Sequence, residues 1–254
     1  MSKLIGIVGG VGPKAGESTH AAVLANTRAV RDSDHLHVLL YTNPSVPDRT
    51  EFVLGRSTEN PATEILRSLR LLVQFGCGVV CVPCNTAHSP AVWDVVQEGF
   101  QEFAAGAELL NIVELTAEFV THTYPSTSHV GLLATDGTIA AEVYQHAFNH
   151  RNVRVVLPTE TNQRRVQEAI YHPDWGIKSK SSPVAQEAVD ALETAAFRMI
   201  ADGAEAMILG CTEIPLALAE PTLKNIPLVN TTAVLAREAI RRAAGEEKLV
   251  TLRR

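Results

Sequence analysis

The chain has 254 residues, 46% of them hydrophobic, which is enough to bury the core of one large domain or two small ones. Its net charge of −6 gives no basic surface for nucleic acid or an anionic membrane, and no segment reaches the roughly 20 apolar residues that span a bilayer. Four cysteines are too few for a disulfide framework, and no clear signal peptide precedes them. We therefore expect reduced thiols in a cytoplasmic protein.

Two short apolar runs near the N-terminus, residues 4–8 and 36–41, predict buried strands. The first run follows a lysine and so faintly resembles a signal peptide. Glycines end this run early, however, and no clear cleavage pattern follows. We interpret the run as a strand that enters a turn.

A helix is predicted over residues 60–76. Asn60 suits the N-cap and Pro61 the first helical position, where a missing N–H costs nothing. An apolar stripe at helical spacing follows, and Gly76 provides the stop. The strand VVCVP then begins at once and ends in Cys84. Strand, helix and strand with short connections predict a parallel sheet with right-handed crossovers.

The same order of elements returns in the second half of the chain. A helix is predicted over residues 184–202, and the strand after it runs into Cys211. Gly76 precedes Cys84 by eight residues, and Gly203 precedes Cys211 by the same eight. The repeated order of elements alone could come from any βαβ fold. We favour a duplicated half-domain, because a cysteine recurs at the same strand end in both halves. The pattern leaves linkers only around residues 112–128 and 226–232.

The paired cysteines indicate one shared site. Ligands of open parallel sheets bind beyond the carboxyl ends of the strands, where both cysteines stand. If the halves face each other, one thiol can remove a proton from a carbon while the other returns one from the opposite side. This reaction needs a thiolate and a thiol at the same moment. The polar turns Asn85-Thr86 and Thr212-Glu213 should open helices whose N–H groups favour a thiolate and hold a carboxylate.

Four motifs resemble those of the cofactor-independent aspartate/glutamate racemases: VGGVGP at 8–13, PDRT at 47–50, PCNTAH at 83–88 and LGCTE at 209–213. The resemblance runs through essentially the whole chain. It implies an α/β fold of two pseudo-symmetric Rossmann-like domains with parallel sheets, which close over a small acidic amino acid in the cleft between them. The domains would comprise residues 1–114 plus 231–254, and residues 115–230. The resemblance also implies a homodimer that uses no cofactor, neither pyridoxal phosphate nor a metal.

The resemblance further assigns roles to individual residues. It makes Cys84 and Cys211 the acid and base, Arg49 the partner of the side-chain carboxylate, and Lys178 a cation from the second half. The residues it implies for substrate binding are Gly10, Val11, Arg49, Asn85, Thr86, Ala87, Thr135, Lys178, Thr212 and Glu213, with His88 in support. Position 11 is Val where many members have Met, and position 213 is Glu where wall-precursor glutamate racemases usually have His. With His88 and PDRT, this favours the aspartate racemase branch.

Alternative interpretations stay open on the sequence alone. Cys81, Cys84 and His88 have a spacing that could coordinate zinc, but a fourth ligand and a second C-x-x-C are missing. A redox pair is disfavoured because Pro83 lies between the two thiols inside a strand end. We interpret Cys77 and Cys81 as buried strand residues.

A second set of alternatives concerns the class of protein. The turn Gly10-x-Gly12-x-x-Ala15 formally fits the fingerprint of an NAD-dependent dehydrogenase, with Asp32 or Asp34 about twenty residues further on. Hydantoin racemases, maleate isomerases, decarboxylases and non-catalytic binding relatives are competitors on the same scaffold. We expect instead a racemase that interconverts L- and D-aspartate, with glutamate as a second candidate, by two-base proton transfer at Cα.

Overall fold

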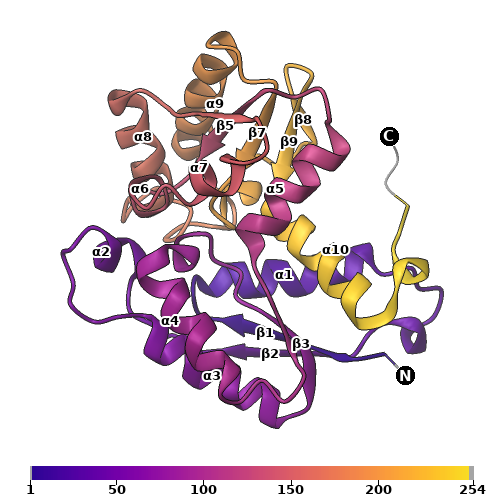
Figure 1. Ribbon diagram of the computed structural model, residues 1–254. Helices are drawn as coiled ribbons and strands as arrows, with labels where there is room; N and C mark the ends of the chain where they lie inside the picture. The colour runs from indigo at the N-terminus through magenta and orange to yellow at the C-terminus, as the bar shows by residue number, and fades with distance from the viewer. Residues whose placement is uncertain (1, 252–254) are drawn as a thin grey trace.

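The computed structural model describes residues 2–251 and contains two β-sheets, each covered by helices (Figure 1). The first sheet has the order β2-β1-β3-β4 and the second the order β6-β5-β7-β9-β8. The strands are β1 (Leu4–Gly9), β2 (Val38–Thr42), β3 (Cys77–Cys81), β4 (Glu108–Leu110), β5 (His129–Leu133), β6 (Arg154–Val156), β7 (Ala206–Leu209), β8 (Thr222–Leu223) and β9 (Ile226–Asn230). All pairings are parallel except that of β8 with β9.

The two sheets repeat one topology. Counted within its own half, each parallel sheet has the strand order 2-1-3-4, with β5, β6, β7 and β9 in the places of β1 to β4. This shared order confirms the prediction of a pseudo-symmetric α/β fold. In such doubly wound sheets the ligand crevice opens between the first and third strands, at their carboxyl ends.

Helices cover both faces of each sheet. In the first half, α1 (Pro13–Asn26) and α10 (Thr231–Ala244) pack on one face, and α3 (Ala62–Gln74) and α4 (Pro90–Gln101) form the other layer. In the second half, α8 and α9 pack together on one side, and α5 and α7 on the other. These helices span α5 (Ile112–Thr123), α7 (Val143–Phe148), α8 (Glu160–Tyr171) and α9 (Gln186–Ala201), and the short α2 (Arg49–Val53) and α6 (Asp136–Ala140) lie between the halves.

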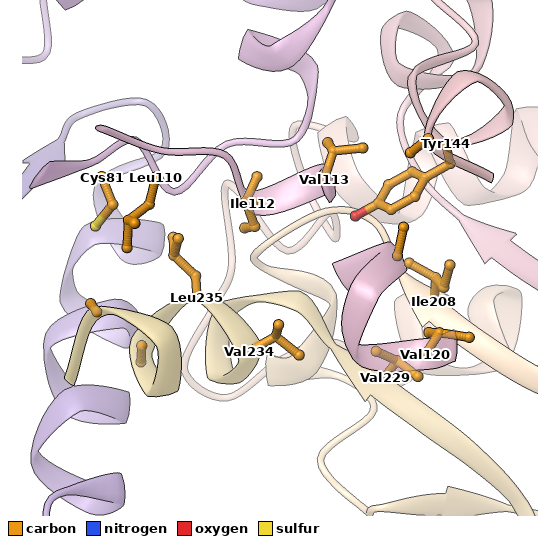
Figure 2. Close-up of a cluster of buried hydrophobic side chains, with 14 of the residues drawn as sticks. Cys81, Leu110, Ile112, Val113, Val120, Tyr144, Ile208, Val229, Val234 and Leu235 are labelled. Atoms are coloured by element: carbon orange, nitrogen blue, oxygen red, sulfur yellow. The ribbon is translucent and has the colours of Figure 1, made fainter. Parts of the chain in front are cut away.

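A hydrophobic cluster between the sheets joins the two halves (Figure 2). Ile112 of α5 and Leu235 of α10 are fully buried in it, together with Cys81 from the first sheet and Ile208 from the second. The alternation along β1 fits this arrangement, since Ile5 and Ile7 belong to this cluster while Val8 faces the outer helices. Each fully buried aliphatic side chain of this size contributes about 1.5–3 kcal/mol, so the halves are held firmly.

The connections between the halves differ from the predicted linkers. Residues 112–123 form helix α5, and residues 226–230 form strand β9, which leads directly into α10. Both connections bury apolar side chains in the central cluster, and this burial orders them. The last helix, α10, contacts α1, β1 and β3 of the first half. The domain boundaries given above stay a prediction.

Several predicted elements have shifted ends. Strand β2 begins at Val38, the residue that pairs with Ile5, rather than at residue 36. Helix α3 begins one residue after Pro61, although the Asn60 side chain does accept a hydrogen bond from the N–H of Ala62 at 2.9 Å. Within residues 2–251, no helix is both long and apolar enough to cross a membrane.

Candidate active site

Cys84 and Cys211 lie in one pocket between the two halves, beyond the carboxyl ends of β3 and β7. Their side chains are buried to the same degree, with exposed fractions of 8% and 7%. The pocket is lined by Val11, Arg49, Cys84, Asn85, Thr86, Thr135, Tyr171, Lys178, Gly210, Cys211, Thr212 and Glu213. The structure thus brings both predicted catalytic cysteines to one pocket, together with most of the residues predicted to bind the substrate.

Eight of the ten predicted binding residues form the pocket wall itself. The ninth, Ala87, is fully buried directly behind the wall, between Thr86 and His88 in the chain. The tenth, Gly10, packs against another backbone segment: its φ is 87°, and a Cβ atom there would lie only 2.1 Å from the carbonyl oxygen of Asn43. Gly10 therefore shapes the turn after β1 and does not line the pocket.

The two cysteines are reached by different backbone paths. Strand β3 ends at Cys81, three residues earlier than predicted, because Pro83 has no N–H to continue a ladder. The chain turns instead, with the N–H of Cys84 donating to the carbonyl of Val82 at 2.8 Å. In the second half, the N–H of Gly210 donates to the carbonyl of Leu133 at 2.7 Å and so leads straight from β7 to Cys211.

The helices predicted after the cysteines are single turns. Residues Thr86–His88 and Ile214–Leu216 form 3₁₀-helices of three residues each, and α4 begins only at Pro90. Helices this short supply little macrodipole, which corrects the prediction of full helix N-termini at both thiols. The first N–H groups of such a turn still have no intrahelical acceptor and can bind an anion.

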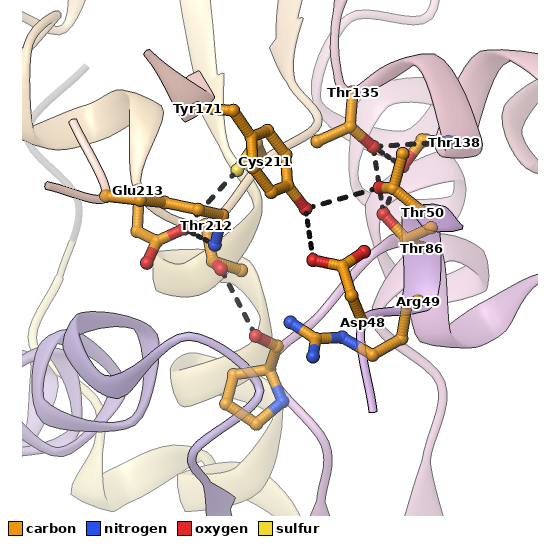
Figure 3. Close-up of polar contacts among 12 residues, drawn as sticks. Asp48, Arg49, Thr50, Thr86, Thr135, Thr138, Tyr171, Cys211, Thr212 and Glu213 are labelled. Carbon is orange, nitrogen blue, oxygen red and sulfur yellow. Dashed lines mark hydrogen bonds and ion pairs between the residues drawn. The ribbon is translucent and has the colours of Figure 1, made fainter. Parts of the chain in front are cut away.

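Arg49 is the first residue of α2 and points into the pocket (Figure 3). Its Nη1 donates to the carbonyls of Val46 (3.4 Å) and Pro47 (3.0 Å), which fixes one end of the buried guanidinium. Its buried Nε has no hydrogen-bond partner in the described part of the chain. Burial lowers the pKa of Arg49, but the acidic groups around it, with Cys84 the foremost, together outweigh this effect and the pKa is raised.

Lys178 and Glu213 form an ion pair on the opposite side of the pocket, with 2.5 Å between Nζ and Oε2. Burial lowers the pKa of Lys178, but the acidic groups around it, with Glu213 the foremost, together reverse this effect and raise the pKa. The same Oε2 accepts a weak hydrogen bond from Cys211 Sγ at 3.7 Å. Burial, reinforced by the Glu213 charge, raises the pKa of Cys211 to about 12.

Hydroxyl groups join the two halves around the pocket (Figure 3). Thr86 Oγ1 lies 3.0 Å from Thr135 Oγ1 and 2.8 Å from Thr138 Oγ1, which belong to the second half. The Thr212 hydroxyl of the second half donates to the carbonyl of Pro83 in the first half at 3.2 Å. The Asn85 amide is also engaged, since its Oδ1 accepts from the Tyr144 hydroxyl at 2.6 Å. Its Nδ2 donates to Thr231 Oγ1 at 3.4 Å.

Tyr171 is a pocket residue that the sequence did not predict. Its hydroxyl donates to Asp48 Oδ2 and to Thr50 Oγ1, both at 3.3 Å, and Lys178 Nζ lies 5.3 Å from the centre of its ring. Burial raises its pKa, so the hydroxyl keeps its proton. Tyr171 is the last residue of α8, seven residues before Lys178, and no motif in the sequence marks it as a pocket residue. Only the docking of the two halves brings its hydroxyl to Asp48.

The pocket is nearly closed. The free space between its lining residues has room for about one water molecule. An amino acid is larger than this space. The pocket must therefore widen to admit a substrate and narrow again around it.

His88 lies behind Cys84 rather than in the pocket wall. Its Nδ1 bonds to the carbonyl oxygen of Cys84 at 2.8 Å, and its ring stacks on Trp93 with 3.7 Å between centroids. Burial lowers its pKa to about 4, so the ring is neutral near pH 7 and donates from Nδ1. His88 can therefore hold the backbone of Cys84 in place, but near pH 7 it has no charge that could act on the thiol.

The geometry also bears on the two alternative sites. Cys81 packs into the central cluster (Figure 2) whereas Cys84 lines the pocket, so the two thiols do not converge on one point. Among residues 2–251, no group of three or more His, Cys, Asp and Glu side chains is arranged to hold a metal. At the glycine turn, a Cβ atom on Gly12 would lie 2.5 Å from Glu213 Oε1. A carboxylate thus occupies the side of the turn where a dinucleotide pyrophosphate would have to approach.

Two α/β halves of equal topology, each with a cysteine beyond its third strand, define a protein with a paired-thiol pocket. The model of the Asp/Glu/hydantoin racemase family matches residues 8–239, and the chain belongs to this family. Racemases are isomerases, which supports an enzyme of that class.

Individual relatives agree with the family assignment. The chain is 26% identical over 243 residues to the broad-specificity amino-acid racemase RacX of Bacillus subtilis, which covers 93% of this chain and 96% of that protein. The structure of Picrophilus torridus aspartate racemase is 28% identical, covers 95% of this chain and 94% of its own, and superposes with a TM-score of 0.79. Glutamate racemase from Francisella tularensis, solved with D-glutamate, is 15% identical and shares the fold, with a TM-score of 0.66 over 99% of this chain and 85% of its own.

Proposed function

We propose that the protein is an amino-acid racemase that interconverts L- and D-aspartate, with glutamate as a second candidate. The observation that carries this proposal is the pair of equally buried thiols, one from each half, that line a single pocket with Arg49. Both thiols follow the third strand of their sheets, so the pseudo-symmetry aims them at a common centre.

In the proposed mechanism the substrate's Cα lies between the two sulfur atoms. A thiolate on one side removes the Cα proton, and the thiol on the other side delivers its proton to the opposite face of the carbon. The chemistry needs no cofactor, because the thiols supply both proton transfers. The negative charge that develops on the α-carboxylate would be stabilised by N–H groups of the turn after Cys84 and by the threonine hydroxyls around it.

Arg49 supports an acidic substrate. Because its Nη1 is held by two backbone carbonyls, the edge formed by Nε and Nη2 remains for a planar, two-point contact with a carboxylate. Lys178 would add a second cation from the other half, shared with Glu213. The name of the Picrophilus relative also favours aspartate, whereas the name of the Bacillus relative argues for testing a range of amino acids.

The experiment that tests this function is incubation with single L-amino acids in heavy water. We expect deuterium at Cα and the appearance of the D-enantiomer with aspartate, in enzyme treated with a chelator and given no pyridoxal phosphate. A variant that carries both Cys84→Ala and Cys211→Ala is the matched control and should show neither signal. The proposal fails if no amino acid exchanges its Cα proton, or if the enzyme instead turns over hydantoins, maleate or a malonate derivative.

A further inference from the structure

We infer that Glu213 keeps Cys211 protonated in the resting enzyme, so that Cys84 is the resting base and Cys211 the resting acid. This inference rests on the proposed two-thiol function and adds to it a positioning role for Glu213. It starts from an asymmetry between the halves: the thiol of the first half faces a cation, whereas the thiol of the second half touches a carboxylate.

The carboxylate of Glu213 is fixed against Cys211. Its Oε2 accepts from Cys211 Sγ at 3.7 Å, and the residue is only 2% exposed. The other oxygen of the carboxylate, Oε1, packs against the turn after β1. A Cβ atom on Gly12 in that turn would lie 2.5 Å from it. A carboxylate in this position can accept a hydrogen bond from the thiol but would repel a thiolate. The contact therefore favours the protonated form of Cys211.

Lys178 opposes this effect only in part. Its Nζ lies 2.5 Å from the same Oε2 and is therefore committed to Glu213. As long as the pair is intact, the group in contact with Cys211 Sγ is the carboxylate. If the charge of Glu213 is removed, the half-buried cation of Lys178 is no longer paired with it and would then favour the thiolate of Cys211.

Cys84 has the opposite surroundings. The charged group beside it in the pocket is the buried guanidinium of Arg49, a cation, whereas Cys211 has a carboxylate within hydrogen-bond distance. The other charged group beside Arg49 is Asp48, whose carboxylate is occupied by the N–H of Glu51 and the hydroxyl of Tyr171. His88 contacts the carbonyl of Cys84 and carries no charge near pH 7.

The proton balance of one turnover follows from this assignment. The Cα–H bond breaks and an S–H bond forms at Cys84, while the S–H bond of Cys211 breaks and a new Cα–H bond forms. The enzyme is left with a Cys84 thiol and a Cys211 thiolate beside Glu213. This state is disfavoured, so a proton must leave Cys84 and one must reach Cys211 through solvent before the same enantiomer is processed again.

The rates for the two enantiomers cannot test the inference. A racemisation has an equilibrium constant of one, so kcat/KM must be equal in the two directions whichever thiol is protonated at rest. The protonation states of the two thiols can be measured directly. Only the thiolate is alkylated, and the matched exposure of Cys84 and Cys211 in one pocket makes their access to a small reagent comparable.

The experiment is alkylation with iodoacetamide between pH 6 and 10, with the modification of each cysteine followed by peptide mass spectrometry. At pH 7.5 we expect Cys84 to react at least about tenfold faster than Cys211, as one pKa unit changes the thiolate fraction tenfold. In Glu213→Gln, Cys211 should react about tenfold faster than in the wild type at each pH of this range. Cys84 serves as the internal reference and should change less than about twofold.

Glu213→Asp is the conservative variant and keeps a negative charge. We expect its Cys211 to stay slow, which separates the effect of charge from that of a disturbed fold. The inference is overturned if Cys211 of the wild type reacts as fast as Cys84, or if Glu213→Gln leaves the alkylation rate of Cys211 unchanged. Alkylation requires no turnover, so these outcomes are independent of whether the exchange experiment finds racemisation.

Discussion

The first and second halves of the molecule deliver a cysteine to the same pocket along different paths. In both halves, a glycine with positive φ ends a helix eight residues before the cysteine, Gly76 at 88° and Gly203 at 98°. Beyond that glycine the paths diverge: Cys84 comes three residues after its strand, and Cys211 only two. The number of residues from the glycine to the cysteine is the same in both halves. The halves differ in how these residues are divided between the strand and the turn that follows it.

The side chains around the two thiols diverge further than the backbones. Arg49 faces Cys84, whereas the Lys178–Glu213 pair faces Cys211. A duplicated topology therefore gives two thiols in equivalent positions, and the residues that surround them can make one a better base and the other a better acid. Each prediction below tests how far the two halves are equivalent.

The largest effect is expected from removing either thiol. Because general acid–base groups contribute about 10²–10⁴-fold, Cys84→Ala and Cys211→Ala should each reduce racemisation of aspartate by at least about 100-fold. Chiral chromatography of the product measures this loss. Cys77→Ala is the matched control, since Cys77 is buried at the start of β3 and does not line the pocket; it should retain activity. Normal turnover in either pocket variant would contradict the two-thiol mechanism.

The next effect concerns closure of the halves. Gly137 of α6 packs on Thr50 of the first half, and a Cβ atom there would lie 2.8 Å from Thr50 Cα. Gly137→Ala should therefore hold the halves apart and lower kcat/KM by about 100-fold, the typical cost of a displacement near 1 Å. Its unfolding free energy should not fall by more than about 1 kcal/mol, because alanine is the better helix former.

Ala140→Gly is the control for this experiment. Ala140 is exposed on the same short helix, so the variant changes helix propensity without adding an atom between the halves. It should keep near-normal kcat/KM. Equal activity of Gly137→Ala and wild type would mean that closure does not require the observed contact of Gly137 with Thr50.

A smaller effect is expected at the carboxylate-binding side chain of the first half. Arg49→Lys keeps the charge but loses the planar fork, and such a charge-assisted contact is worth about 1.5–3 kcal/mol, or roughly ten- to a hundredfold. We expect kcat/KM for aspartate to fall by this factor and kcat/KM for alanine to fall less. Steady-state assays with both amino acids measure the difference. Equal losses for the two substrates would show that Arg49 has a structural role.

The parts of this molecule that the sequence predicted are those that depend on local pattern. The helix stops at Gly76 and Gly203, the strands after them and the meeting of the two cysteines all follow from periodicity and spacing along the chain. Strand β3 is shorter than predicted. The apolar run continues past Cys81, but Pro83 has no N–H to donate to a neighbouring strand.

Other features depend on how the halves dock, which no local pattern encodes. Tyr171 reaches Asp48 and Thr50 across more than a hundred residues of sequence, and Thr138 meets Thr86 in the same way. The predicted linkers turned out to be helix α5 and strand β9 because their apolar side chains are buried between the sheets. Lys178 was expected to be a cation from the second half, but its ion pair with Glu213, 35 residues further along the chain, depends on how the loop folds onto the pocket.

The smallest effect is one on stability and concerns His88, which supports only the first thiol. Burial lowers its pKa to about 4, against about 6.5 in an unfolded chain. Between these two pH values the unfolded state binds a proton that the folded state does not. The contribution of the neutral ring is therefore fully present above pH 6.5 and is lost as the pH falls toward 4, by at most about 1.4 kcal/mol per pH unit.

His88→Asn removes the titrating ring but retains an N–H that can donate to the carbonyl of Cys84. We expect urea unfolding at pH 7.5, 6.0 and 5.0 to show a smaller loss of unfolding free energy in this variant than in the wild type. The same replacement at the exposed His122 should leave the wild-type slope unchanged, which controls for the loss of any histidine. If wild type and His88→Asn lose stability in parallel over this range, the pKa of His88 in the folded protein is the same as in the unfolded chain, and the ring is protonated in the folded protein below that pH. The ring would then carry a charge four residues from Cys84, and the first half would hold a second cation beside its thiol.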